Sequence, residues 1–399
     1  MRVARECKKI VAEILVAGIF DKHRRRHVRH ILRTMEPIKN LVDLFRFLLE
    51  KKRGEILYIE PSDAHGEIAP GYLYYFIKAG YRVDVVLDSA VAEERPLCGM
   101  LPHPSIRLFS TNVFFLKKWL SVIARRNYKL IFISTSQLYQ KDGSLFCNEF
   151  ESFCVENANR LLLVEHNLNN VPHSVAEYDL YRQGKLSVIT NFNRDKHLLE
   201  LNPSYFGSFP EKEEKANKPV FLIVGGFDLS RRNPRLVIDA IRFLLKKGYD
   251  QFEVVAVGSG NFGELPQDIQ SFIHIRGRVN YPDMFSEMCR ADFFLPLFDP
   301  TLEEHIKYKE TVSSGSIQLI LGFSVPALID ETFATAYGFN KENALLYCDN
   351  QLGERMVEAI QMNQEEWSQM RENIKAYREE KYRSGIACIK SCIERAYLK

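Results

Sequence analysis

The chain has 399 residues, of which 46% are hydrophobic and 26% charged. This is the balance of a folded globular protein long enough for two domains, and it excludes an intrinsically disordered chain. No apolar run is as long as a membrane-spanning helix, and the N-terminus lacks the apolar core and cleavage site of a secretory signal. The eight cysteines include no C-x-x-C pair, so their spacing indicates neither a zinc site nor a disulfide framework. A cytoplasmic location is expected.

Positive charge is concentrated at the N-terminus. Residues 1–54 hold fifteen Lys and Arg against six Asp and Glu, a net charge of +9, whereas the whole chain carries +3. Apolar residues at helical spacing, such as Ile10 with Ile14, predict a basic amphipathic helical extension. Its charges either face solvent or rest on an anionic membrane surface, here the inner face of the membrane. Nucleic acid is not an expected partner, because the basic run lacks the aromatic residues that stack on bases.

From residue 55 onward, short apolar runs alternate with segments of helical periodicity. This alternation predicts βαβ units and a parallel sheet. Residues 55–202 are therefore expected to form an N-terminal Rossmann-like domain. Its predicted strands are Ile56–Glu60, Tyr81–Leu87, Ile106–Phe109, Leu130–Ser134, Leu161–Glu165 and Leu186–Thr190. Its predicted helices are Tyr72–Ala79, Val113–Arg125 and Phe146–Ala158.

A second series of strands and helices follows a linker rich in Pro, Gly and charged residues, residues 203–219. Residues 220–350 are expected to form a second Rossmann-like domain, and 351–399 to form helices that pack back across both domains. The predicted strands are Val220–Val224, Phe252–Val257, Ile273–Arg276, Phe293–Leu297 and Ala327–Ile329, and the predicted helices are Pro234–Lys247, Pro282–Cys289 and Ser316–Leu321. The predicted fold class is α/β, with two tandem doubly wound parallel sheets that face a cleft.

The stretch Lys307–Pro326 has the pattern of an anion-binding helix start. Two lysines precede a Ser-Ser-Gly-Ser turn, and an apolar helix follows the turn. Ser313 and Ser314 are favoured N-cap residues, and Gly315 lets a ligand approach the backbone closely. The N–H groups of the first helical turn, with the helix dipole behind them, suit a phosphate or pyrophosphate. The alternative interpretation is a capped core helix.

Several short motifs follow one another in the second domain. They are V-G-G-F-D-L-S-R-R-N (224–233), V-V-A-V-G-S-G (254–260), I-R-G-R-V (275–279), A-D-F-F-L-P (291–296) and the turn and helix that end in S-V-P (313–326). In order and spacing they resemble the nucleotide-sugar-binding half of the GT-B glycosyltransferases, most of all the retaining family 4. The N-terminal domain resembles the same enzymes through H-G-E (65–67) and V-E-H-N (164–167).

Two positions depart from the family's pattern. Seven residues separate Glu310 from Gln318, where the family carries the second of two glutamates, and Ser324 replaces the glycine before Val-Pro. These two departures leave open which carboxylate would hold the donor sugar, and whether the chain is active.

A nucleotide-sugar donor leaves as a diphosphate, whose negative charge must be neutralised as the sugar–oxygen bond breaks. The sequence contains no Asp-x-Asp, so fixed cations and helix-terminus amides are expected in place of a metal, and no cofactor is expected. The predicted donor-binding residues are Gly226, Arg231, Arg232, Gly258, Arg276, Gly277, Lys307, Lys309, Ser313, Ser314, Gly315 and Ser316.

The predicted catalytic residues are His166, at the end of a strand that faces the cleft, and Glu310, which could accept hydrogen bonds from sugar hydroxyls. His65, Gly66 and Glu67 are predicted to contact the acceptor. Each of these residues has an ordinary structural alternative. A lone histidine is more often a satisfied structural residue, and Glu310 could be a simple helix-entry acid.

The resemblance implies a glycosyltransferase that moves a sugar from a nucleotide-sugar to a glycan or lipid-linked glycan, with retention and without a metal. It also implies that the acceptor binds the first domain and the donor the second. Two alternatives are a nucleotide-sugar epimerase of the same fold and a catalytically silent subunit of a glycan-assembly complex.

Overall fold

The computed structural model describes residues 54–62, 65–111, 126–135, 156–170, 199–260, 265–349 and 351–397, with a short strand and isolated residues between these ranges. The predicted helices at Val113–Arg125 and Phe146–Ala158 lie largely outside the described residues. So does most of the predicted basic extension, residues 1–54.

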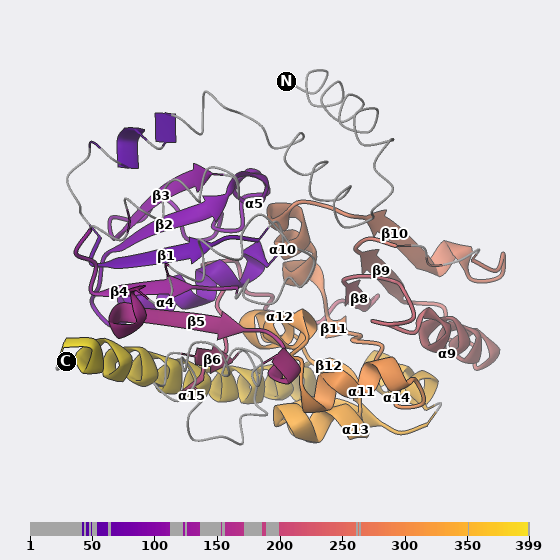
Figure 1. Cartoon of the computed structure of the whole chain (residues 1–399). Helices are drawn as coiled ribbons and strands as arrows, with labels where there is room; N and C mark the ends of the chain where they lie inside the picture. The colour runs from indigo at the N-terminus through magenta and orange to yellow at the C-terminus, as the bar shows by residue number, and fades with distance from the viewer. Residues whose placement is uncertain are drawn as a thin grey trace.

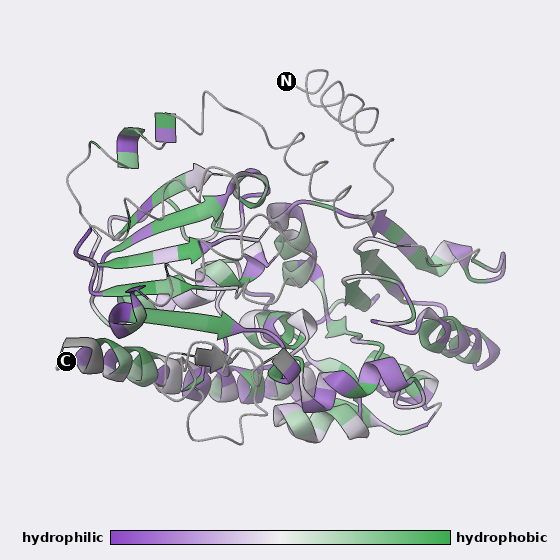
Figure 2. Ribbon diagram, viewed as in Figure 1, coloured by the Kyte–Doolittle hydropathy of each residue, from purple (hydrophilic) through white to green (hydrophobic). Residues whose placement is uncertain are grey.

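The first domain is built on a seven-stranded parallel sheet in the order β3-β2-β1-β4-β5-β6-β7. Its strands are β1 (Ile56–Glu60), β2 (Val83–Asp88), β3 (Ile106–Thr111), β4 (Leu130–Ile133), β5 (Leu161–Glu165), β6 (Leu186–Val188) and β7 (Leu199–Glu200). Every residue of β1, β2, β4 and β5 is buried. These strands are hydrophobic along most of their length (Figure 2), as expected of a parallel sheet covered on both faces. Helix α4 (Ala69–Lys78) packs on this sheet, and α5 (Ser89–Glu93) follows β2.

The second domain is built on a six-stranded parallel sheet in the order β10-β9-β8-β11-β12-β13. Its strands are β8 (Val220–Val224), β9 (Glu253–Val257), β10 (Ile273–Gly277), β11 (Phe293–Phe294), β12 (Ala327–Asp330) and β13 (Ala344–Tyr347). Its helices are α9 (Pro234–Lys246), α10 (Tyr281–Arg290), α11 (Glu303–Glu310), α12 (Gly315–Phe323), α13 (Glu331–Ala334) and α14 (Leu352–Gln361). The predicted fold class, two doubly wound α/β domains, is confirmed.

The structure differs from the predicted elements in several places. Helix α4 begins at Ala69 instead of Tyr72, because Pro70 is compatible with a first helical turn, so the loop before it is shorter than predicted. The charged segment before the Ser-Ser-Gly-Ser turn is itself a helix, α11. Strands β7 and β13 were not predicted, and β11 contains two residues instead of the five expected.

The two domains face each other. In Figure 1 the arrowheads of β1, β4 and β5 point toward α10 and α12 of the second domain. Helix α15 (Gln364–Tyr397) runs beneath both domains in the same view. Its Trp367 Nε1 donates a hydrogen bond of 3.1 Å to the carbonyl of Asp292, and its Tyr382 hydroxyl donates one of 3.1 Å to the carbonyl of Ser204. The long final helix therefore ties the second domain to the start of the linker.

Candidate functional site

Each sheet has a topological switch point, where successive crossovers leave in opposite directions. In the first sheet this point lies between β1 and β4, and in the second between β8 and β11. Ligands of open α/β sheets bind beyond the carboxyl ends of the strands at such points. The residues that follow β1, β4, β8 and β11 are therefore where a site is expected.

Beyond β8 the chain places a buried cation. Arg232 is 6% exposed, and its Nη2 donates a hydrogen bond of 2.6 Å to the hydroxyl of Ser316 on α12. Its Nη1 donates a longer bond of 3.3 Å to the carbonyl of Gly226, and its Nε is buried without a partner. A Cβ on Gly225 would lie 2.3 Å from Nη1, so only glycine leaves room for the guanidinium.

No described residue forms an ion pair with Arg232. The nearby carboxylate of Asp228 instead lies 3.6 Å from Arg231 and accepts a hydrogen bond from the Ser230 hydroxyl. Burial lowers the pKa of Arg232 to about 10, so the group is still charged at neutral pH. A buried, charged guanidinium without a counter-ion is unfavourable, and a bound anion would relieve it.

The loop that carries Arg232 is fixed by hydrogen bonds to the start of α11. His305 accepts a bond of 2.8 Å at Nδ1 from the Asp299 amide and donates one of 2.9 Å from Nε2 to the Leu229 carbonyl. Both ring nitrogens are used by the backbone, and burial lowers the pKa of His305, so it is a neutral structural residue. Asn233 then caps α9 and donates a bond of 2.6 Å to Asp299.

The first turn of α12 lies beside Arg232. Ser314 is the N-cap, as predicted, and its side chain accepts a hydrogen bond of 3.3 Å from the Ser316 amide. A Cβ built on Gly315 would meet nothing within 4 Å, so the helix start borders open space. Ser313 lies just before the cap and accepts a long contact of 3.5 Å from Gln318. The helix dipole and Arg232 therefore act on the same space.

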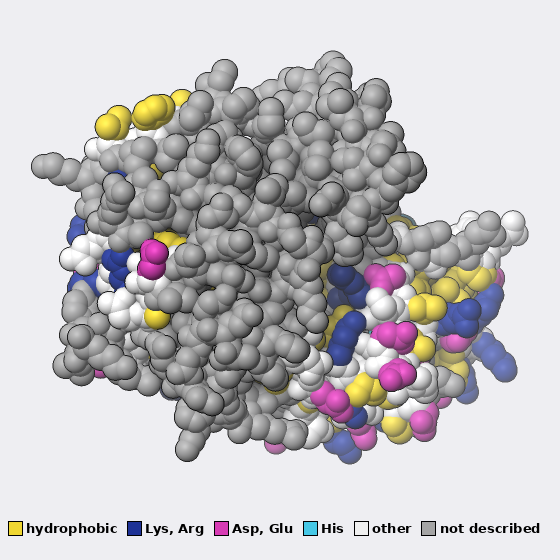
Figure 3. Space-filling model, in the orientation of Figure 1, with side chains coloured by type: hydrophobic (Ala, Val, Ile, Leu, Met, Phe, Trp, Pro, Cys, Tyr) yellow, Lys and Arg dark blue, Asp and Glu magenta, His cyan; other side chains and the backbone are white. Residues whose placement is uncertain are grey.

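The other predicted cations of the second domain take different positions. Lys307 donates to the Ser230 carbonyl at 3.2 Å and lies over the ring of Tyr308. Lys309 is two positions further along α11 and lies roughly 200° around that helix, so the two lysines do not act together. Arg231 is exposed beside Asp228. In Figure 3, Lys and Arg side chains of the second domain are interspersed with Asp and Glu side chains.

Arg276 and the predicted glycines can be placed as well. Arg276 lies 3.0 Å from Glu287 on an exposed face of β10, the edge strand of its sheet. Gly277 has a positive φ of 67° with open space around it. A Cβ on Gly258 would lie 1.7 Å from the Gly225 carbonyl oxygen, so Gly258 lets two strand-end turns touch. A Cβ on Gly226 would meet Arg231 instead of open space.

The two positions that depart from the family pattern have physical explanations. Gln318 is 3% exposed, and its Nε2 donates a bond of 3.3 Å to the Asn202 side chain, a contact that an ionised glutamate could not make. Ser324 ends α12 with a φ of 51°, a conformation that favours glycine, and its hydroxyl accepts a bond of 3.0 Å from Arg378. Glu310 is exposed at the end of α11.

The switch point of the first sheet holds a buried acid that was not predicted. Glu60 ends β1 and is 1% exposed. It accepts hydrogen bonds from the hydroxyls of Ser134 and Thr135, at 2.7 and 2.8 Å, and from the Ser62 amide at 2.8 Å. Burial outweighs these bonds and raises the pKa of Glu60 to about 7.

His166 lies next to this acid. Its Nε2 is 2.9 Å from the Ser134 carbonyl and 3.3 Å from the Thr135 hydroxyl. Since a carbonyl only accepts, Nε2 carries the proton and the lone pair of Nδ1 is the acceptor. Burial of the ring and the nearby His65 lower the pKa of His166 to about 3, so the imidazole is neutral. A neutral acceptor at this edge is suited to a sugar hydroxyl.

The predicted acceptor residues lie against the second domain. The Tyr281 hydroxyl at the start of α10 donates a bond of 3.0 Å to Glu67, and a Cβ on Gly66 would come within 3.1 Å of that hydroxyl. Burial alone would raise the pKa of Glu67, but hydrogen bonds that include those from His65 and Tyr281 hold it below the usual value. The His65 ring lies 4.4 Å from that of His166, centroid to centroid. Glu67 is thus engaged in a contact between the domains.

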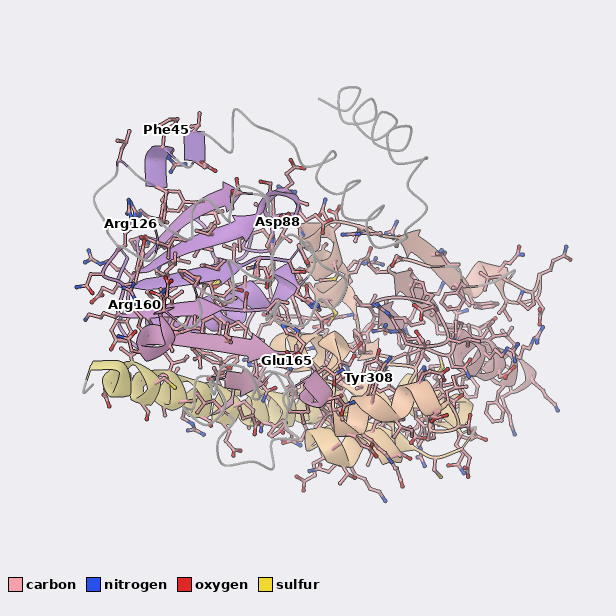
Figure 4. The ribbon with its side chains drawn as sticks, viewed as in Figure 1. Phe45, Asp88, Arg126, Arg160, Glu165 and Tyr308 are labelled. Carbon is pink, nitrogen blue, oxygen red and sulfur yellow. The ribbon has the colours of Figure 1, made fainter. Side chains whose placement is uncertain are left out.

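A second set of contacts between the two domains lies just before α12. The Leu168 amide donates a bond of 2.9 Å to the Thr311 carbonyl, and Asn167 forms an antiparallel bridge with Val312. Figure 4 shows Glu165 at the end of β5 on the side of α11, where Tyr308 is labelled. His166 and the N-terminus of α12 are therefore held on neighbouring segments.

Within the described ranges, no group of three or more His, Cys, Asp or Glu side chains is placed to hold a metal ion. The candidate site is instead a cationic and amide-lined half in the second domain, opposite a half with an acid and a histidine in the first domain.

Sequence reasoning missed Glu60, Ser134, Thr135 and Tyr281. A signal for Glu60 was present, since an acid that ends a fully apolar run in a parallel sheet lies at the ligand-binding edge. Nothing local indicates Tyr281, because its partner Glu67 is more than two hundred residues away in the chain.

No protein-family model and no curated protein matches the chain. Among solved structures, a glycosyltransferase from Rickettsia africae is similar with a TM-score of 0.57 at 13% identity, over 84% of this chain and 96% of that one. AviGT4, a glycosyltransferase involved in avilamycin A biosynthesis, gives a TM-score of 0.49 at 10% identity over 83% and 98% of the two chains. Anabaena HepE in complex with UDP gives 0.47 at 15% identity over 84% and 97%. The chain shares the two-domain GT-B fold of the Rickettsia protein.

Replacing Glu60 by Gln should change how stability depends on pH. A carboxyl group whose pKa is raised by folding stabilises the protein below its unfolded pKa, and this contribution is lost as the pH rises to the folded value, here about 7. From pH 5 to pH 8 the free energy of unfolding of the wild type should fall by about 2 kcal/mol relative to Glu60→Gln. Urea denaturation at several pH values measures this difference.

Glu55, just before β1, is the matched control. It lies 2.9 Å from Lys129, and its hydrogen bond to that lysine lowers its pKa. The contribution of Glu55 is therefore lost only as the pH falls through that lowered value, and the difference between Glu55→Gln and the wild type should stay constant from pH 5 to pH 8. Identical pH profiles for Glu60→Gln and the wild type would show that Glu60 is not held protonated by burial.

Proposed function

We propose that the protein is a glycosyltransferase that moves a sugar from a nucleotide-sugar donor to a glycan or lipid-linked glycan, in the biosynthesis of a polysaccharide or lipopolysaccharide. The observation that carries this proposal is Arg232, a buried cation without an ion-pair partner among the described residues, next to the N-terminus of α12. A diphosphate supplies the missing negative charge and accepts the helix-terminus amides. The GT-B fold and the order of the sequence motifs support the same function.

In the proposed reaction the bond between the anomeric carbon and the diphosphate oxygen breaks, and a bond from that carbon to the acceptor oxygen forms on the same face. The proton of the acceptor hydroxyl passes to the leaving phosphate, so no protein base is needed. Arg232 and the first turn of α12 stabilise the negative charge on the diphosphate as it develops. His166 accepts a hydrogen bond from the sugar at Nδ1, and closure of the domains excludes water. Because these groups neutralise the diphosphate, the proposed mechanism is metal-independent.

A membrane-associated acceptor is supported by a surface feature near the N-terminus. Val42, Phe45 and Leu49 are 51, 56 and 80% exposed, and their spacing places them along one side of a helix. Phe45 points away from the sheet in Figure 4, and hydrophobic side chains project at the corresponding place in Figure 3. This apolar ridge lies within the segment of net charge +9, a combination suited to an anionic lipid surface. No helix in the described part of the chain is long and apolar enough to cross a membrane.

Thermal-shift measurements with UDP-, GDP-, ADP- and CMP-sugars, with and without EDTA, test the proposed donor site. A selective rise in melting temperature that survives EDTA supports a metal-independent nucleotide-sugar site and names the base. Acceptor screening by mass spectrometry then tests transfer. Isomerisation of the donor without an acceptor would favour the epimerase, and a folded protein that responds to no donor would favour the silent subunit.

Arg232→Met should weaken binding of the nucleoside diphosphate by at least about tenfold, because two charge-assisted hydrogen bonds are lost. The melting temperature without ligand should not fall, since the substitution removes a buried charge that has no ion-pair partner. Isothermal titration calorimetry and a thermal melt measure the two effects. Arg242→Met is the control, because Arg242 is exposed and paired with Asp268 on the outer side of α9. Equal affinities for both variants would contradict the donor site.

Replacing Val42, Phe45 and Leu49 together by Ser should reduce flotation with liposomes that contain anionic lipid, while the melting temperature stays unchanged because all three side chains are exposed. Arg46→Gln serves as a partial control, because it removes one positive charge and leaves the three apolar side chains of the ridge in place. The membrane surface is excluded as a partner if wild-type protein fails to float, or if the triple variant floats as well as the wild type.

A further inference from the structure

A pocket of about 290 Å³ lies along the linker between the two domains. Its walls come from the linker (Tyr205–Lys212), from α15, and from the C-terminal end of α12 at Gly322 and Phe323. Tyr74 of α4 and the end of α10, at Met288 and Cys289, complete the lining. The candidate site described above lies at the other end of α12, about 13 Å away for a helix of this length. The pocket contains none of the residues predicted or proposed to bind the nucleotide-sugar.

Arg371 of α15 is the residue of this pocket that indicates a bound ligand. It lines the pocket, is 5% exposed, and forms no hydrogen bond or ion pair with any described residue. Its guanidinium lies over the ring of Trp367, 4.8 Å from the ring centroid. None of its nitrogen atoms is among the fully buried polar atoms that lack a hydrogen-bond partner. Its N–H groups therefore border the pocket, where a bound anion can accept their hydrogen bonds.

The other charged residues of the pocket are already neutralised. Lys212 lies 2.6 Å from Asp292, and Glu211 lies 2.7 Å from Lys375. Arg378 pairs with Glu379 at 3.3 Å. Arg378 also donates from Nη1 to the carbonyl of Gly322 and to the hydroxyl of Ser324, while its Nε is buried without a partner. Arg371 is therefore the charged residue of the pocket that has no ion-pair partner among the described residues. The carboxylates of Glu211, Asp292 and Glu372 act on it from further away and partly offset the lowering of its pKa by burial.

Aromatic rings form part of the pocket wall. Tyr74 and Tyr205 are stacked with centroids 4.2 Å apart, and Tyr382 lies 5.0 Å from Tyr74. Phe209 and Phe323 pack together with centroids 5.4 Å apart. An aromatic wall beside a free guanidinium suits a small ligand that joins an apolar or ring portion to an anionic group.

We propose that this linker pocket is a second binding site, distinct from the donor site, for a small phosphate ester whose phosphate is held by Arg371. The planar guanidinium can give a phosphate two parallel hydrogen bonds, and the volume accommodates a phosphate with a small substituent. Because the walls belong to the linker and to α15, which contacts both domains, an occupant lies where the relative orientation of the domains is set. The site does not depend on the proposed glycosyl transfer.

Tryptophan fluorescence tests the phosphate site directly. Trp119 and Trp367 are the two tryptophans of the chain, so Trp119→Phe leaves the indole beneath Arg371 as the reporter. Titration of the full chain with inorganic phosphate, at ionic strength matched with sodium chloride, should give a saturable change in the millimolar range. Arg371→Met in this background should weaken phosphate binding at least about tenfold, because the charge and both bonds are lost.

Three further variants make the outcome decisive. Arg383→Met changes an exposed arginine of the same helix and should bind phosphate like the parent. Arg232→Met should also bind like the parent, which separates this site from the donor site. Arg371→Lys keeps the charge but lacks the planar guanidinium, so it should bind phosphate several-fold more weakly. This variant still tests the proposal if Arg371→Met does not fold. The absence of a saturable response in the parent, or unchanged affinity in both Arg371 variants, would overturn the proposal.

Discussion

The burial of Arg232 is the constraint on which the arrangement of the second domain depends. The guanidinium fits because Gly225 has no side chain, and the fixed neutral His305 holds the preceding loop in place. The hydroxyl of Ser316 accepts a hydrogen bond from Arg232 and so holds the first turn of α12 beside the guanidinium. A charge that folding leaves without a counter-ion reduces stability, and such a cost is characteristic of a site organised for a ligand.

The two topological switch points place different chemical groups on the two sides of the candidate site. Each sheet directs its carboxyl edge toward the other domain, with Arg232 and the amides of α12 on one side and Glu60 with His166 on the other. Contacts on both flanks hold these halves together, through Tyr281 on α10 and through the bridge between Asn167 and Val312. The same contacts explain why residues expected to meet an acceptor, such as Glu67, also touch the second domain.

The sequence was sufficient to predict the fold class, because hydrophobic runs and helical periodicity determine which segments can be buried in parallel sheets. It also predicted the cap at Ser314 and singled out Arg232, since both follow from local rules. The sequence could not show that Arg231 is exposed while its neighbour is buried, or that Gln318 reaches Asn202. Those outcomes depend on contacts between segments far apart in the chain. Helix α11 was missed because its charged surface carries little hydrophobic periodicity.

The most direct test of the account is a crystal structure of the protein with the nucleoside diphosphate selected by the thermal-shift measurements. A diphosphate is expected in contact with the guanidinium of Arg232 and with the first turn of α12, with the site for the sugar facing His166 across the cleft. A diphosphate bound away from Arg232, with this arginine still lacking an anionic partner, would contradict the proposed donor site.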